Sequence, residues 1–183
     1  MGLLIVGLVL WSLPHLFKRI APGLRAGMGD GAAKAIVAVT SLAGIVAMVI
    51  GYRSAEFVPV YDPPGWGVHL NNLLMVIAVV LLGAAHSKSR LRGMLRHPML
   101  LAVLVWAVAH LIANGDLASL VLFGGLGAWA LISILMINAR VPDYVPYKGG
   151  SLAGDIRLAV ISVVVFAVIV GIHAWLGVSP FPG

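Results

Sequence analysis

Six apolar runs alternate with short polar stretches along the chain of 183 residues, and the charged side chains lie between these runs or at their edges. A run of about 20 apolar residues is long enough to cross the hydrocarbon core of a membrane as a helix. The pattern therefore predicts an all-α integral membrane protein, a bundle of six transmembrane helices that forms a single domain over residues 1–183. The helices are expected at about residues 2–17, 32–51, 68–86, 97–113, 117–138 and 156–176.

The fourth run has the clearest boundaries. Pro98 suits the first turn of a helix, where its missing N–H group would have no partner within the helix. Asn114-Gly115 is a typical helix end, and the carboxylate of Asp116 is a good N-cap for the next helix. We therefore expect a tight hairpin between the fourth and fifth helices.

The charges of the loops predict the orientation of the chain in the membrane. The first, third and fifth loops carry a net positive charge, and the third, Ser87 to Arg96, has four basic residues and no acid. Basic residues concentrate on the cytoplasmic side of a membrane. Lys18 and Arg19 follow the first run rather than precede it, which argues against a cleaved signal peptide. These features favour a multi-pass protein of the bacterial cytoplasmic (inner) membrane with both termini in the periplasm.

The composition of the chain limits which cofactors and cross-links it can contain. The chain is 61% hydrophobic and contains no cysteine, which excludes disulfides, iron–sulfur clusters, thiolate-ligated haem and c-type haem attachment. Its formal net charge is +6. The basic residues lie in short loops between apolar runs. We therefore expect them to orient the protein in the membrane and to contact anionic lipid headgroups, and we expect no nucleic acid as partner.

The histidines are the candidates for chemistry. His110 lies well inside the fourth run, where an ionisable side chain is costly and often functional, and Trp106 shares its helix face one turn earlier. Neutral imidazoles on facing helices are suitable axial ligands for a b-type haem. From the residues alone, His110 and His69 are the preferred pair, because their helices are neighbours in sequence. A structural role for each, such as a hydrogen bond to another helix, is the alternative.

A longer set of motifs resembles a known family. These are Arg96-His97-Pro98, Ala109-His110, Ala113-Asn114-Gly115-Asp116, Leu122-Phe123-Gly124-Gly125, Ala128-Trp129 and Leu13-Pro14-His15. Together they are similar to the bacterial NnrU family, over roughly the first 140 residues. Members of that family are associated with denitrification and nitric oxide metabolism, and the plant zeta-carotene isomerase is a distant relative.

The resemblance implies b-type haem (iron) and a candidate ligand set. In the isomerase, histidines at the positions of His15 and His110 are regarded as the haem-linked pair, and a redox-controlled change of ligation is thought to open the iron for isomerisation of a polyene. The predicted topology places His15 near the cytoplasmic face and His110 toward the other side. We therefore keep His15, His69 and His110 as metal ligands, with Trp106 as a further haem contact.

Three functions follow from these features. The first is a haem-binding membrane protein, either a redox-dependent isomerase or oxidoreductase, or an accessory factor in nitric oxide metabolism. The second is a membrane methyltransferase related to isoprenylcysteine carboxyl methyltransferase, because Arg-His-Pro at a helix start also resembles that family. The third is a carrier or assembly partner without chemistry. Expected partners are membrane lipid, a hydrophobic polyene or nitric oxide, and a second copy of the chain or a respiratory complex.

Overall fold

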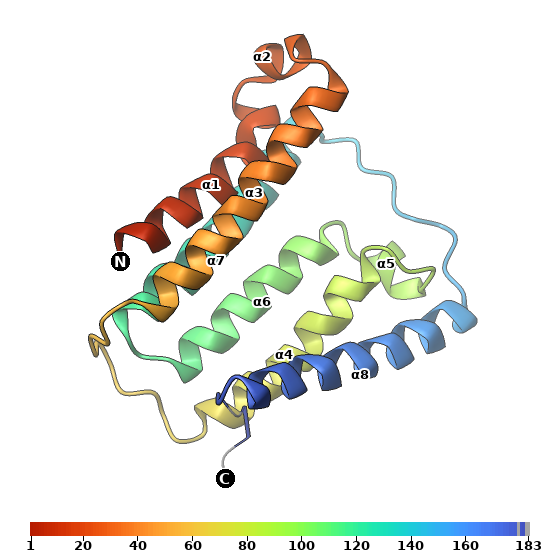
Figure 1. Ribbon diagram of the computed structural model, residues 1–183. Coiled ribbons are helices and arrows are strands. Elements are labelled where there is room, and N and C mark those ends of the chain that lie inside the picture. The colour runs from red at the N-terminus through yellow and green to blue at the C-terminus, as the bar shows by residue number, and fades with distance from the viewer. Residues whose placement is uncertain (179, 182–183) are drawn as a thin grey trace. The chain divides into compact units, whose positions relative to one another are not determined.

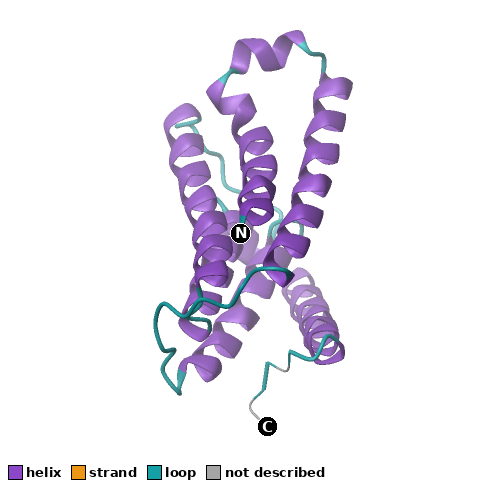
Figure 2. Ribbon diagram, turned by 60° about the vertical axis from the view of Figure 1, so that its left-hand side comes forward, coloured by secondary structure: helices purple, strands orange, loops and turns teal. Residues whose placement is uncertain are grey.

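The chain folds almost entirely into helices, as a computed structural model of the protein shows for residues 1–178, 180 and 181 (Figure 1). The helices are α1 (Gly2–Ile20), α2 (Pro22–Gly27), α3 (Asp30–Arg53), α4 (Gly67–Ala84), α5 (Arg90–Met94), α6 (Pro98–Ala113), α7 (Leu117–Arg140) and α8 (Leu152–Trp175). Figure 2 shows helices and loops without strands for the described residues, which confirms the all-helical class.

Two compact units divide these helices. The first comprises Met1–Asp62 and Gly115–Arg140, and so contains α1, α2, α3 and α7. The second comprises Pro63–Asn114 and Val141–Gly183, and contains α4, α5, α6 and α8. That the two act as a single domain stays a prediction.

Five helices are long and apolar enough to cross a membrane, namely α1, α3, α4, α7 and α8. Large apolar side chains cover their outer faces; on α8, for example, Val163 is 69% exposed. Such a surface is suited to lipid and not to water. The sixth expected span, α6, has 16 residues and at about 1.5 Å per residue is about 24 Å long. A multi-pass membrane protein is supported, whereas the count of six spans remains a prediction.

Each of the six expected ranges coincides with a helix, and the ends agree within four residues. The largest difference is at α8, which begins at Leu152 instead of 156 because the Ser151 side chain accepts a hydrogen bond from the Gly154 N–H group and caps the helix. Helix α1 continues through Pro14 to Ile20. The short helices α2 and α5 lie in stretches that we expected to be loops.

In the first unit, glycines bring α1 and α3 into backbone contact. A Cβ atom on Gly7 would lie 2.6 Å from the Met48 nitrogen and 2.8 Å from the Gly44 oxygen. A Cβ atom on Gly51 would lie 2.4 Å from the Leu4 nitrogen. Small residues permit such close approach between membrane helices. Leu4 and Met48 are buried here and, with Ala118 of α7, form the core of the unit.

Small residues of α3 and α7 differ in what they contact. On α3, Ala47 and Gly51 are buried, whereas Ala43 is exposed and Gly44 makes the contact with α1. On α7, a Cβ atom on Gly124 would meet nothing within 4 Å. The neighbouring Gly125 packs against Leu8 instead, with 2.9 Å from its ideal Cβ position to the nearest Leu8 atom.

The start of α7 is tied to the end of α3. Asp116 accepts a hydrogen bond from the Ser119 N–H group at 2.9 Å, so the predicted N-cap is confirmed. The Ser119 hydroxyl donates to the same carboxylate and lies 2.9 Å from the Tyr52 hydroxyl of α3. Asp116 also lies near Tyr61, whose pKa is raised by burial and by this carboxylate. The chain Tyr52–Ser119–Asp116 thus satisfies a buried serine with partners from two elements.

In the second unit, α4 packs between α6 and α8. Gly67, in the first turn of α4, allows the chain to approach Ile112 near the end of α6, with 2.8 Å from its ideal Cβ position to the Ile112 oxygen. Gly83, in the last turn of α4, faces Leu158 near the start of α8. Helix α4 therefore runs antiparallel to both neighbours, so its start lies beside the ends of α6 and α8.

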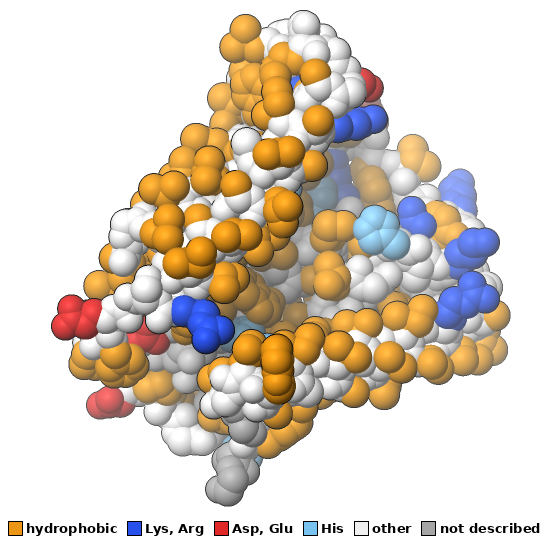
Figure 3. All heavy atoms as spheres, viewed as in Figure 1, with side chains coloured by type: hydrophobic (Ala, Val, Ile, Leu, Met, Phe, Trp, Pro, Cys, Tyr) orange, Lys and Arg blue, Asp and Glu red, His pale blue; other side chains and the backbone are white. Residues whose placement is uncertain are grey.

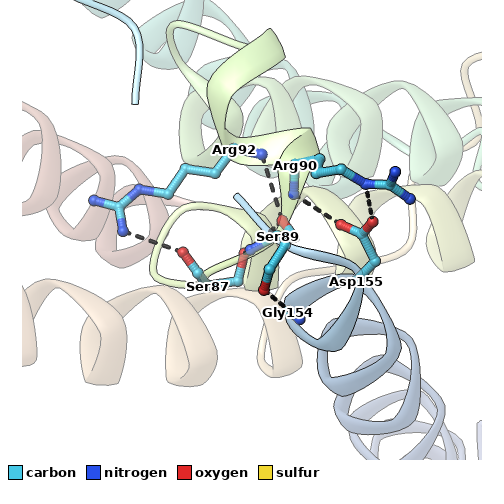
Figure 4. Close-up of polar contacts among 7 residues, drawn as sticks. Ser87, Ser89, Arg90, Arg92, Gly154 and Asp155 are labelled. Carbon is cyan, nitrogen blue, oxygen red and sulfur yellow. Dashed lines mark hydrogen bonds and ion pairs between the residues drawn. The ribbon is translucent and has the colours of Figure 1, made fainter. Parts of the chain in front are cut away.

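A polar junction fixes the opposite end of this unit (Figure 4). Ser89 is fully buried and caps α5 by accepting a hydrogen bond from the Arg92 N–H group. Asp155 of α8 accepts hydrogen bonds from the Arg90 backbone at 2.8 Å and from the Arg90 side chain at 2.5 Å. Gly154 has no room for a side chain, because a Cβ atom would lie 1.9 Å from the Lys88 oxygen. The loop before α5 is therefore packed directly on α8.

The glycine contact of α1 with α3 yields a test of the packing. Gly7→Ala adds a Cβ atom against two backbone atoms that cannot rotate away, so we expect a loss of about 1–3 kcal/mol of stability. Gly124→Ala is the matched control, and its better helix propensity should leave stability equal or raise it by up to about 1 kcal/mol. Thermal unfolding in detergent, followed by circular dichroism, measures both. Equal stability of the two variants would contradict this packing.

Candidate functional site

His15 lies in a half-buried aromatic cluster of the first unit. Its ring stacks on Trp11 of the same helix, with 4.4 Å between ring centroids and 30° between planes. Trp129 of α7 meets the His15 ring edge-on at 5.4 Å and also meets Trp11 at 5.6 Å. Two helices therefore hold this imidazole between indole rings.

The same arrangement recurs on α6 in the second unit. His110 follows Trp106 by four residues, as His15 follows Trp11, and the two rings lie 5.2 Å apart with 49° between planes. Trp106 was expected on the face of His110, whereas Trp11 and Trp129 were not predicted to contact His15. The repeated spacing of Trp and His by four residues is the signal that would have identified Trp11.

Hydrogen bonds set the proton position on both rings. The Nδ1 atom of His15 lies 2.6 Å from the Trp11 carbonyl oxygen, and that of His110 lies 2.9 Å from the Trp106 carbonyl oxygen. A carbonyl oxygen only accepts, so Nδ1 carries the hydrogen and Nε2 carries the lone pair of the neutral ring. Histidines that bind metals through Nε2 are commonly oriented in this way.

The aromatic cluster of the first unit also contains two hydrogen-bond donors that have no acceptor. The indole Nε1 atoms of Trp11 and Trp129 are both buried and without a hydrogen-bond partner in the described part of the chain. Trp129 as a whole is only 9% exposed. A buried indole N–H group normally finds a partner. The two indole N–H groups beside His15 therefore lack the acceptor that such buried groups normally have.

Four further histidines of the second unit lie toward one end or the other of its helices. His69, in the first turn of α4, is exposed, and its position lies at the same end of the unit as His110. His173 of α8 joins them there; its Nδ1 donates to the Ile169 oxygen at 2.8 Å, and it interacts electrostatically with His110. His86 and His97 belong to the opposite end, beside α5.

The described residues contain no group of three or more histidine, aspartate or glutamate side chains placed to hold a metal ion. A haem differs from such a site because the porphyrin supplies four of the iron ligands, and the protein adds axial ones. Each unit contains one imidazole whose Nδ1 is bonded to a tryptophan carbonyl oxygen, His15 in the first unit and His110 in the second, and an imidazole of this kind is chemically suited to be an axial ligand of iron.

Comparison with known proteins bears on the whole chain. The sequence profile of a family described as NnrU protein matches residues 3–180. No curated protein and no solved structure matches the sequence significantly. The match extends well beyond the first 140 residues on which the resemblance was recognised, and it includes α8. The chain belongs to the NnrU family.

Proposed function

We propose that this membrane protein binds a b-type haem through histidine axial ligands. The observation that supports this proposal best is the hydrogen bonding of two imidazoles. His15 and His110 each donate Nδ1–H to the carbonyl oxygen of a tryptophan four residues earlier. In a neutral ring with Nδ1–H, Nε2 is the acceptor nitrogen, which is the atom that would coordinate iron. The axial ligands are drawn from His15, His69 and His110.

The tryptophans would orient and enclose the ligand. Trp11 and Trp106 keep their histidine rings in place through ring contact and through their own carbonyl oxygens. The buried indole N–H groups of Trp11 and Trp129 would donate to an acceptor of the bound molecule.

A bound haem would supply a redox-active iron centre. Such a centre suits either a redox-dependent cis–trans isomerisation of a hydrophobic polyene or an accessory role in nitric oxide and denitrification metabolism. A polyene and nitric oxide are both soluble in hydrocarbon, so either molecule would reach the protein from the lipid. A second copy of the chain or a respiratory complex is the partner that we propose for electron supply.

The basic residues of the second unit support one orientation in the bacterial inner membrane. Four of them lie together at the α5 end of this unit, namely Lys88, Arg90, Arg92 and Arg96. Basic residues favour the cytoplasmic side of a membrane. We propose that this end is cytoplasmic and that both termini are periplasmic.

The methyltransferase and carrier alternatives stay predictions. The chain belongs over residues 3–180 to the NnrU family, whose resemblance implies haem and not S-adenosylmethionine as the cofactor. Isothermal titration of the purified protein with S-adenosylmethionine separates the first alternative from the proposal.

Haem binding is tested by absorption spectra of the full-length protein purified after expression with a haem precursor. We expect a Soret band that shifts on reduction. His110→Gly should retain roughly tenfold less haem per protein. Loss of a residue that only hydrogen-bonds to a metal ligand already lowers metal affinity on the order of 10–100-fold, so loss of the ligand itself should lower it at least as much. Added imidazole should restore the band by replacing the lost ring.

Matched variants make this result specific. His15→Gly and His69→Gly identify the second ligand, and His86→Gly, an exposed histidine beside α5, serves as the control that keeps its haem. Circular dichroism establishes that each variant is folded. A folded protein without a Soret band, or equal bands in all four variants, would refute the proposal.

Orientation is tested by labelling single cysteines, which the natural absence of cysteine makes straightforward. Glu56→Cys and Lys88→Cys place thiols at exposed positions in the α3–α4 and α4–α5 loops. In intact cells with a permeabilised outer membrane, an impermeant maleimide should label Cys at position 56 and should reach position 88 only after lysis. The reverse pattern would show the opposite orientation.

A further inference from the structure

A cavity of about 490 Å³ lies at the α5 end of the second unit, away from His69 and His110. It is bounded by the end of α4, by α5, by the start of α6 and by the extended segment that precedes α8. Its polar lining comes from Arg92, Arg96, His97, Tyr144 and Tyr147. In the space-filling view, Lys and Arg side chains gather over the α5 region and the start of α8 (Figure 3).

The two arginines of this cavity are held in place. The Arg92 guanidinium lies 4.3 Å from the centroid of the Tyr147 ring and donates to the Ser87 oxygen at 3.1 Å. The Arg96 guanidinium lies 5.2 Å from the centroid of the Tyr144 ring and donates to the Val141 oxygen. Each of these bonds uses one of five N–H groups. Most donors on both side chains therefore remain for a ligand.

Among the described residues, no carboxylate forms an ion pair with Arg92 or Arg96. The ion pairs of the described residues are Arg25 with Asp30 and Arg90 with Asp155, and neither involves an arginine of the cavity. Asp155 is engaged by the backbone and side chain of Arg90 (Figure 4), and Asp143, which precedes Tyr144 in the segment beside the cavity, forms no ion pair with either arginine. Two guanidinium groups thus line one cavity without a counter-ion, an arrangement that favours an anion.

We propose that this cavity binds the phosphate group of an anionic ligand. Guanidinium groups pair with phosphate oxygens in a bidentate manner, and tyrosine rings beneath them preserve the required orientation. Met99 and Leu100 also line the cavity in the first turn of α6, where backbone N–H groups have no acceptor within the helix. Arginine side chains and amides therefore converge on the same space.

The rim of the cavity favours a phospholipid as the source of the phosphate. Val145 is 77% exposed and Met99 is 42% exposed, so apolar side chains border the charged lining. Basic pockets at the cytoplasmic interface are typical sites for anionic headgroups. A soluble phosphate ester offers the same group without a tail, and the experiment separates the two sources.

The test uses the purified full-length protein and measures thermal stabilisation and binding by microscale thermophoresis. The probes are short-chain phosphatidylglycerol, short-chain phosphatidylcholine, glycerol 3-phosphate and S-adenosylmethionine. We expect phosphatidylglycerol to bind about tenfold more tightly than phosphatidylcholine, because each basic residue strengthens binding to anionic lipid. Competition by glycerol 3-phosphate would identify a soluble ester as sufficient; its absence would identify lipid.

The variant Arg92→Gln/Arg96→Gln should lose this preference. Lys88→Gln/Lys148→Gln is the matched control, because it removes two exposed positive charges of the same unit that do not line the cavity. If the double arginine variant does not fold, the single variant Arg96→Gln tests the proposal instead. The natural protein should prefer phosphatidylglycerol, and Arg96→Gln should lose that preference. Equal binding of both lipids, equal losses in both double variants, or preferential binding of S-adenosylmethionine would overturn the proposal.

Discussion

Hydrocarbon offers no partner for a polar group, and this constraint governs the polar side chains of the apolar helices. Thr40 and Ser41 donate to carbonyl oxygens one turn earlier. His15, His110 and His173 do the same through Nδ1, at 2.6–2.9 Å. A bond of this kind satisfies the side chain without a second helix, and for a histidine it also decides which nitrogen carries the lone pair.

Much of the fold could be predicted because its determinants are local. Pro98 and Asn114 delimit α6, and Asp116 caps α7, since each acts through its own backbone neighbourhood. Hydrophobic runs gave the remaining helices to within a turn or so. The start of α8 was missed because the Ser151 cap is a weak signal among polar loop residues.

The candidate site was less predictable because it depends on how helices are rotated. Which small residue of α3 meets α1 depends on the partner surface, so Gly44 and not Ala43 makes the contact. Trp129 is far from His15 in sequence, and only the packing of α7 against α1 brings the two rings together. The pairing of Trp11 with His15 was accessible in principle, because residues four apart share a helix face.

The second unit separates two kinds of chemistry along its helices. His110 lies in the last turn of α6, whereas Arg96 and His97 precede its first residue, Pro98. Twelve steps of about 1.5 Å place Pro98 and His110 roughly 18 Å apart along the axis. The arginines at the other end carry a permanent positive charge and suit the membrane interface. An anion at the arginines would therefore interact only weakly with iron at the histidines, and the two proposed sites are physically independent.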